Sequence, residues 1–121
     1  MNQSDCINMV VMLKTATLKK KIHWEENDGD FSTKVGGCLI ELVSYYDFQV
    51  GVSSYSLRLY NTENVLFETI SYSEDVDNDD YQRLNDLYKT IRDVNYKITE
   101  SEKIILDGLK NLIAPDDELP F

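Results

Sequence analysis

The sequence predicts an α+β domain in which an N-terminal helix and a long C-terminal helix cover one face of an antiparallel meander sheet. Apolar residues recur with helical spacing near both ends of the chain, whereas the period changes to two in the middle. Short turns rich in Gly, Asn and Asp separate the apolar runs of this middle part. At 121 residues the chain can bury one core, so we expect a single domain over residues 1–121 with four to five strands.

The first helix is expected over residues 4–20. Ser4 and Asp5 can cap its N-terminus by accepting bonds from free amide groups. The three lysines at 19–21 suit the negative C-terminal end of the helix dipole. A phosphate-binding patch is the alternative role for these lysines.

Strands are expected over residues 22–26, 31–35, 38–44, 55–60 and 65–72. Asn27-Asp28-Gly29 supplies the positive φ angles of a hairpin turn, and Gly36 with Gly37 ends the second strand. Residues 45–52 have a mixed pattern that is typical of a loop or an irregular strand. Sequential strands with short turns form a meander with one wet face.

The last third predicts one helix over residues 79–113. At about 1.5 Å per residue this rod is about 52 Å long, whereas a globule of this size is only about 35 Å across. Thr99 and Glu102 match a capping box that would break the rod. The seven-residue spacing of apolar side chains continues through that site, so we favour a continuous or gently bent helix. The apolar residues Ile98, Ile105 and Leu112 form a seam on the overhanging part of this helix. Such a seam predicts a homo-oligomer formed through the helix. A tail is expected over residues 114–121.

The composition restricts the partners and the compartment. The formal charge is −10, with 22 acidic and 12 basic residues, so direct nucleic-acid binding is disfavoured. Cys6 and Cys38 lack a metal-ligand spacing and are expected as free buried thiols in a reducing cytoplasm. The sequence has neither the pattern of a signal peptide nor an apolar run long enough for a membrane span. We therefore expect a cytoplasmic protein with no membrane partner.

The motifs that carry chemistry all fit poorly. Asp75, Asp77 and Asp79 have the first three spacings of a calcium loop, but the glycine and the final glutamate are missing, so helix capping is favoured over a metal site. His23 is the only histidine, and its pairing with Cys38 for nucleophilic catalysis is disfavoured because Cys38 begins an apolar strand. We expect no enzyme activity, no metal and no cofactor.

Arginine and tyrosine side chains offer the best candidate binding surface. Tyr81, Tyr88 and Arg92 lie near one line of the C-terminal helix, whereas Arg58 and Tyr60 share the polar face of a strand. Such pairs anchor protein interfaces and also suit a planar anionic ligand, by stacking and by bidentate phosphate contact. The alternative is that the tyrosines line the edge of the core. The predicted ligand-binding residues are Arg58, Tyr60, Tyr81, Tyr88, Arg92 and, as a wall, Trp24.

Four segments resemble those of small uncharacterised bacterial and phage proteins that have a helix, a meander and a long C-terminal helix: Lys21-Ile22-His23-Trp24-Glu25, Phe31-Ser32-Thr33, Ile40-Glu41-Leu42 and Leu57-Arg58-Leu59-Tyr60-Asn61. No catalytic residue carries over from this group. The broader class of small, acidic, oligomeric phage proteins includes inhibitors of bacterial immunity, of which some sequester nucleotide signals and others imitate DNA.

The resulting expectation is a non-enzymatic oligomeric binding protein. Its most concrete form is a phage-type anti-defence sponge that holds a nucleotide immune signal where subunits meet, in the host cytoplasm. An acidic protein-binding inhibitor or DNA mimic that acts on a basic partner is the alternative. A small hydrolase that depends on His23 is a third possibility.

Overall fold

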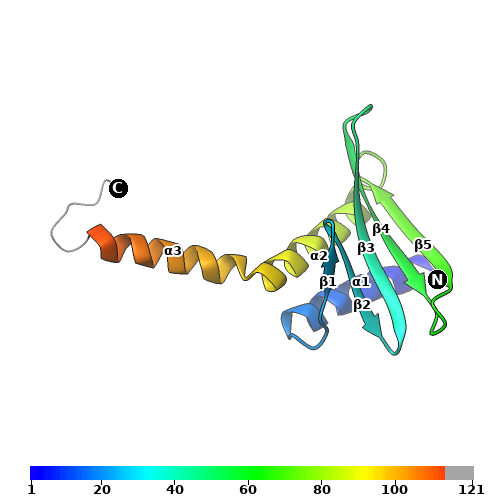
Figure 1. The fold of residues 1–121 in the computed structure, drawn as a ribbon. Coiled ribbons are helices and arrows are strands. Elements are labelled where there is room, and N and C mark those ends of the chain that lie inside the picture. The colour runs from blue at the N-terminus through cyan, green and yellow to red at the C-terminus, as the bar shows by residue number, and fades with distance from the viewer. Residues whose placement is uncertain (114–121) are drawn as a thin grey trace.

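The computed structural model describes residues 1–113, and within them the chain forms three helices and five strands (Figure 1). The predicted α+β class is confirmed. Along the chain the elements are α1 (Gln3–Leu18), β1 (Glu25–Asn27), β2 (Asp30–Val35), β3 (Cys38–Asp47), β4 (Val52–Tyr60), β5 (Leu66–Ser73), α2 (Asn78–Tyr96) and α3 (Ile98–Ile113). The predicted tail over 114–121 lies outside the described residues.

The sheet is an antiparallel meander with the strand order β1-β2-β3-β4-β5. Asn27 pairs with Asp30, so Asp28 and Gly29 form a two-residue turn, and their φ angles of 53° and 86° are those that the sequence predicted for it. The strands β2 and β3 are joined in the same way through Gly36 and Gly37.

Two regions of the sheet differ most from the predicted strand boundaries. The first strand begins at Glu25 rather than at residue 22, because Trp24 turns into the core and makes its hydrogen bonds to helices instead of to a strand. Residues 45–52 are not mainly a loop, since β3 continues to Asp47, which pairs with Val52 at the start of β4. The resulting β3–β4 hairpin extends beyond the rest of the sheet (Figure 1).

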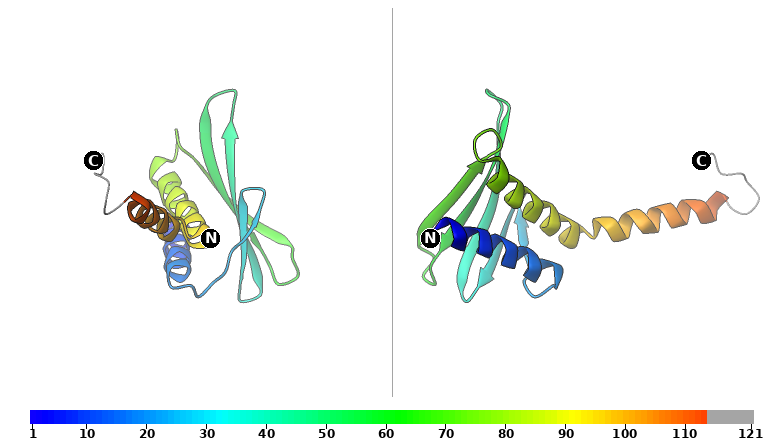
Figure 2. Two further views of the ribbon diagram at one scale, coloured as in Figure 1. Left: turned by 60° about the vertical axis from the view of Figure 1, so that its left-hand side comes forward. Right: turned by 180° about the vertical axis from the view of Figure 1, so that it is seen from behind.

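The helices α1 and α2 cover one face of the sheet, and no described helix covers the other face (Figure 2). On β4 the predicted alternation is confirmed: Leu57 and Leu59 are buried against the helices, whereas Arg58 is exposed on the other face. The side chains buried to 1% exposure or less are Trp24, Phe31, Leu42, Leu57, Leu84, Leu87 and Ile91, with Thr17 as the polar member.

The expected continuous helix over 79–113 is broken at Lys97, so that part of the prediction is wrong. Lys97 adopts the left-handed conformation (φ 51°, ψ 45°), which ends α2. Its carbonyl accepts the amide of Ser101 in α3, and the Asp93 carboxylate accepts both the amide and the hydroxyl of Thr99. The break therefore lies at the capping signal, and a single residue makes it.

Capping at the other end of the chain also differs from the prediction. The side chain of Asn2 accepts the amide of Asp5 at 2.8 Å, so Asn2 caps α1 instead of Ser4 or Asp5. The helix ends at Leu18, and Lys20 follows with a φ of 56°. Helix α1 packs chiefly on α2.

The helix α3 extends away from the domain, as Figure 1 and the right-hand view of Figure 2 show. None of its described side chains is buried. The predicted overhang of the C-terminal segment is therefore present, although the rod is bent at Lys97.

Candidate functional site

Trp24 is part of the core and not the wall of a ligand site. Its side chain is 1% exposed. The indole Nε1 donates to the Thr17 hydroxyl at 2.9 Å, and the Trp24 carbonyl accepts the Asn95 side chain at 2.9 Å. These bonds tie the connection between α1 and β1 to both covering helices, which gives Trp24 a structural role.

Tyr81 and Tyr88 belong to an aromatic cluster beneath α2. The ring centroid of Tyr55 on β4 lies 5.3 Å from the ring centroid of each of them, and the ring centroids of Phe31 and Tyr88 are also 5.3 Å apart. The Tyr88 hydroxyl donates to the Gly29 carbonyl at 2.8 Å, whereas Tyr81 is 7% exposed. These two tyrosines therefore line the core, which was the alternative to ligand binding.

Burial has an electrostatic consequence in this cluster. Desolvation, with a smaller contribution from Tyr81 and Tyr88, raises the pKa of the Tyr55 hydroxyl from 10.0 to about 12. The Tyr55 hydroxyl donates to the Asn85 side chain at 2.7 Å. Tyr55 therefore stays protonated in the folded state at any physiological pH.

Arg92 stays at the surface, next to a tyrosine that the sequence analysis did not select. Its guanidinium carbon lies 5.8 Å from the ring centroid of Tyr96, one turn further along α2. The Tyr96 hydroxyl donates to the Glu26 carboxylate on β1, and this bond raises the pKa of Tyr96. Arg92 and Tyr96 thus form an exposed pair near the end of α2.

Arg58 and Tyr60 lie on the open face of the sheet, where Arg58 pairs in register with Glu41 of β3. Hydrogen bonding to Glu41 raises the pKa of the Tyr60 hydroxyl. The six predicted ligand-binding residues therefore fall into three places: the core, the end of α2 and the open face of the sheet. Within one copy the structure does not bring them together into one site.

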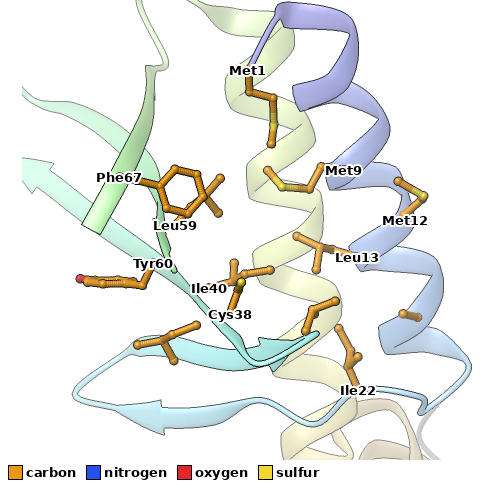
Figure 3. A pocket seen from close by; sticks show the side chains of 13 residues that line it. Met1, Met9, Met12, Leu13, Ile22, Cys38, Ile40, Leu59, Tyr60 and Phe67 are labelled. Atoms are coloured by element: carbon orange, nitrogen blue, oxygen red, sulfur yellow. The ribbon is translucent and has the colours of Figure 1, made fainter. Parts of the chain in front are cut away.

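A predominantly apolar hollow lies elsewhere, between α1 and the sheet (Figure 3). We call it the apolar cleft; its volume is about 390 Å³. Met9 and Leu13 extend into it from α1, opposite Ile40 and Cys38 of β3 (Figure 3). The cleft is lined by Met1, Met9, Met12, Leu13, Ala16, Ile22, Val35, Cys38, Leu39, Ile40, Leu59, Tyr60 and Phe67.

Sequence reasoning missed the cleft, although two signals point to it. Val65, Leu66 and Phe67 are consecutive apolar residues, which a strand with one buried face does not need. In the structure the register shifts between Leu59 and Tyr60 opposite this run, and Phe67 lines the cleft. The second signal is the pair of methionines at 9 and 12, whose flexible thioether side chains are common at adaptable binding surfaces.

The cleft continues into a cationic region at the C-terminal ends of α1 and α2. A neighbouring hollow of about 520 Å³ shares Ile22 and Leu39 with the cleft and is also lined by Lys21, Lys34, His23 and Glu25. A third hollow, of about 280 Å³, shares Ile22 and is bordered by Lys20 and Lys97. Within residues 1–113 none of these four lysines forms an ion pair.

The tests for metal and membrane sites give no candidate in the described chain. In residues 1–113 no group of three or more His, Cys, Asp or Glu side chains is placed to hold a metal ion. The acidic run instead leads into α2, with Asp79 and Asp80 in the first helical turn. None of the described helices combines the length and the apolar character needed to cross a bilayer.

Comparisons with protein-family models, curated proteins and solved structures find no match. Within residues 1–113, two features bear on function, namely the exposed helix α3 and the apolar cleft.

Proposed function

We propose that this chain is a non-catalytic binding protein that self-associates through α3. The observation that carries the proposal is the exposure of apolar side chains along this helix. Ile105, Leu109 and Leu112 are 60%, 53% and 81% exposed, and the domain behind them already has a filled core. A row of large apolar side chains that is left in water marks an interaction surface.

These side chains form one continuous surface, which we call the α3 seam. The spacing of Ile98, Ile105, Leu109 and Leu112 places them on one side of the helix, with Leu106 and Ile113 beside them. Burying one such side chain removes about 60–120 Å² from water. Six side chains in each of two copies thus bury about 700–1,400 Å², close to the lower limit of about 1,200 Å² for a stable interface.

Light scattering of the full chain at micromolar concentration tests self-association. We expect a mass that is a multiple of 14.0 kDa. The substitution Ile105→Asp should return it to one copy, because a charge is then forced into the seam. Ile104→Asp is the matched control: Ile104 has almost the same exposure, 63%, but lies about 100° around α3 from Ile105, outside the seam. A wild-type mass of one copy overturns the proposal.

The more specific form of the proposal is a phage-type anti-defence protein that sequesters a nucleotide signal in the host cytoplasm. Two observations support it. Arg58 and Arg92 are exposed, and neither forms an ion pair within residues 1–113, so both guanidinium groups are available for phosphate. Each lies near a surface tyrosine, Tyr60 or Tyr96, that can stack on a base.

Calorimetry with cyclic nucleotides and ADP-ribose-type nucleotides tests this form. We expect binding that Arg92→Ala or Arg58→Ala weakens, whereas the exposed and ion-paired Arg83→Ala serves as the control. Affinities no tighter than about 100 µM across the panel, roughly −5.5 kcal/mol, would exclude the nucleotide form and leave self-association untouched.

An acidic inhibitor of a basic partner is the second candidate. It is favoured by the exposed carboxylates of Glu74 and Asp75 in the connection from β5 to α2 and of Asp79 in the first turn of α2, together with the net charge of −10. Binding of this kind should weaken steeply with salt and should not respond to Arg92→Ala.

A further inference from the structure

Two apolar surfaces of the described chain have no other part of residues 1–113 packed on them. The α3 seam is convex, and the apolar cleft between α1 and the sheet is concave. We infer that α3 of one copy lies in the apolar cleft of a second copy, and that the exchange is reciprocal. This inference rests on the proposed self-association and names the surface that receives the helix.

A chain cannot fill its own cleft in this way. The helix α3 extends away from the domain (Figures 1 and 2). The junction that sets its direction is held by Lys97, with the left-handed conformation, and by the two bonds from Thr99 to Asp93. An α3 helix that occupies this cleft must therefore come from another copy. A two-fold exchange then covers both seams and both clefts at once, and it closes as a dimer.

The area favours the cleft over a simple pairing of two α3 helices. The seams alone bury about 700–1,400 Å². Docking in the cleft adds four exposed apolar side chains in each copy, which contributes about 500–1,000 Å² more in a dimer. The sum of about 1,200–2,400 Å² lies in the range of stable interfaces. The four added side chains are Met1, Met12, Val35 and Phe67, which are 44–63% exposed.

Charge also separates the two arrangements. Glu102 lies within the seam, four residues after Ile98 and three before Ile105. In a parallel pair of α3 helices the two Glu102 carboxylates occupy equivalent seam positions and repel each other. Docking in the cleft, by contrast, lets a seam carboxylate approach the adjoining hollow, whose lining holds one acid, Glu25, and two lysines, Lys21 and Lys34, without an ion-pair partner within residues 1–113. A lysine there compensates a carboxylate that would otherwise be buried alone.

Disulfide trapping in the full chain tests the arrangement, because Cys38 already lines the cleft as a free thiol. The variants carry Cys6→Ala, to remove the other thiol, and one new cysteine. On mild oxidation, in which a disulfide forms as two thiols each lose a hydrogen to the oxidant, Leu109→Cys or Ile105→Cys should bond to Cys38 of the second copy. Lys103→Cys, on the polar side of α3, should not. Peptide mass spectrometry identifies the bonded pair.

The outcomes separate this inference from the proposal beneath it. A covalent dimer joined through two copies of residue 109, still formed after Cys38→Ser, overturns docking in the cleft and leaves self-association intact. A chain that stays at 14.0 kDa by light scattering overturns both.

A second pair of variants probes the cleft without new cysteines. Ala16 lines the cleft and Thr15, beside it on α1, is exposed outside the lining. Glutamate is a good helix former, so both variants should fold. Ala16→Glu should weaken dimerisation at least about tenfold, a loss of about 1.4 kcal/mol, and Thr15→Glu should leave it within about twofold. Equal dimerisation of the two variants contradicts the inference.

Discussion

The domain over residues 3–96 and the helix α3 are built from the same kinds of apolar side chain but differ in what covers them. On α2, Leu84, Leu87 and Ile91 are completely buried, whereas Leu109 on α3 is 53% exposed. The helical spacing of apolar residues therefore predicts that a helix surface will be covered, but it does not predict which molecule covers it. The domain supplies its own cover for α2, and we propose that α3 receives its cover from a second copy.

The largest effect should come from matched Leu→Ala substitutions in the two regions. Leu87→Ala removes a side chain with 0% exposure and leaves a cavity, so it should lower the free energy of unfolding by about 2–5 kcal/mol. Leu109→Ala should change it by less than about 0.5 kcal/mol. Urea unfolding followed by the fluorescence of Trp24 measures both, in an Ile105→Asp background that prevents association. Equal losses would contradict the contrast between the regions.

The next effect concerns the buried hydrogen bond between Trp24 and Thr17 in the domain. Among the described residues of α3 no side chain is buried, so α3 has no comparable bond. Thr17→Val leaves the buried Trp24 Nε1–H without its acceptor, so it should cost about 1–3 kcal/mol. In a Trp24→Phe background the same substitution should cost less, because no donor is then left unpaired. Urea unfolding followed by circular dichroism gives the free energy of unfolding of the wild type, of each single variant and of the double variant. Identical costs in both backgrounds would refute the role given to this bond.

The aromatic cluster should make the domain sensitive to high pH. The folded state holds the Tyr55 proton up to about pH 12, whereas the unfolded chain releases it near pH 10.0. Its contribution is therefore complete below pH 10 and is lost as the pH rises to 12, by about 1–3 kcal/mol. Tyr55→Phe should flatten this decline in unfolding experiments. An unchanged slope in the variant would show that other tyrosines cause the decline.

The smallest effect is expected at the junction of the two regions. Lys97 has a φ of 51°, a left-handed conformation that glycine adopts without the steric cost that a Cβ imposes. Lys97→Gly should therefore stabilise the chain by about 0.5–1 kcal/mol, whereas Lys97→Ala, which keeps a Cβ, should have almost no effect. Thermal unfolding by circular dichroism compares the two. Destabilisation by glycine would mean that a continuous helix is the preferred state.

Local chemistry explains why most of the sheet could be predicted. The Asp28-Gly29 and Gly36-Gly37 turns specify their own backbone, and the alternation along β4 specifies which face is buried. The break at Lys97 was harder to predict, because one left-handed residue leaves the spacing from Ile91 to Ile98 and Ile105 intact. The capping signal of Thr99 marks the break, whereas the unbroken periodicity of the apolar residues favours a continuous helix.

The site could be predicted only in part, because residue type does not determine position relative to the core. Trp24 and Tyr81 have the chemistry of ligand-binding residues, yet both are buried among core side chains. Arg58 and Arg92 are exposed as a binding surface requires, on different parts of the domain. The apolar cleft depends on how α1 packs beside α2 on the covered face of the sheet, a tertiary arrangement that the methionines of α1 signal only indirectly.

Every strand of the sheet pairs with the strand that precedes it in the chain. Contact order within the sheet is therefore low, and little loop-closure entropy opposes its formation. The hairpins can form one after another during translation, and α2 leaves the ribosome before α3 does. The proposed assembly helix is thus the last described element that a nascent chain presents, so a copy that is still without it cannot pair with its neighbours on one messenger RNA.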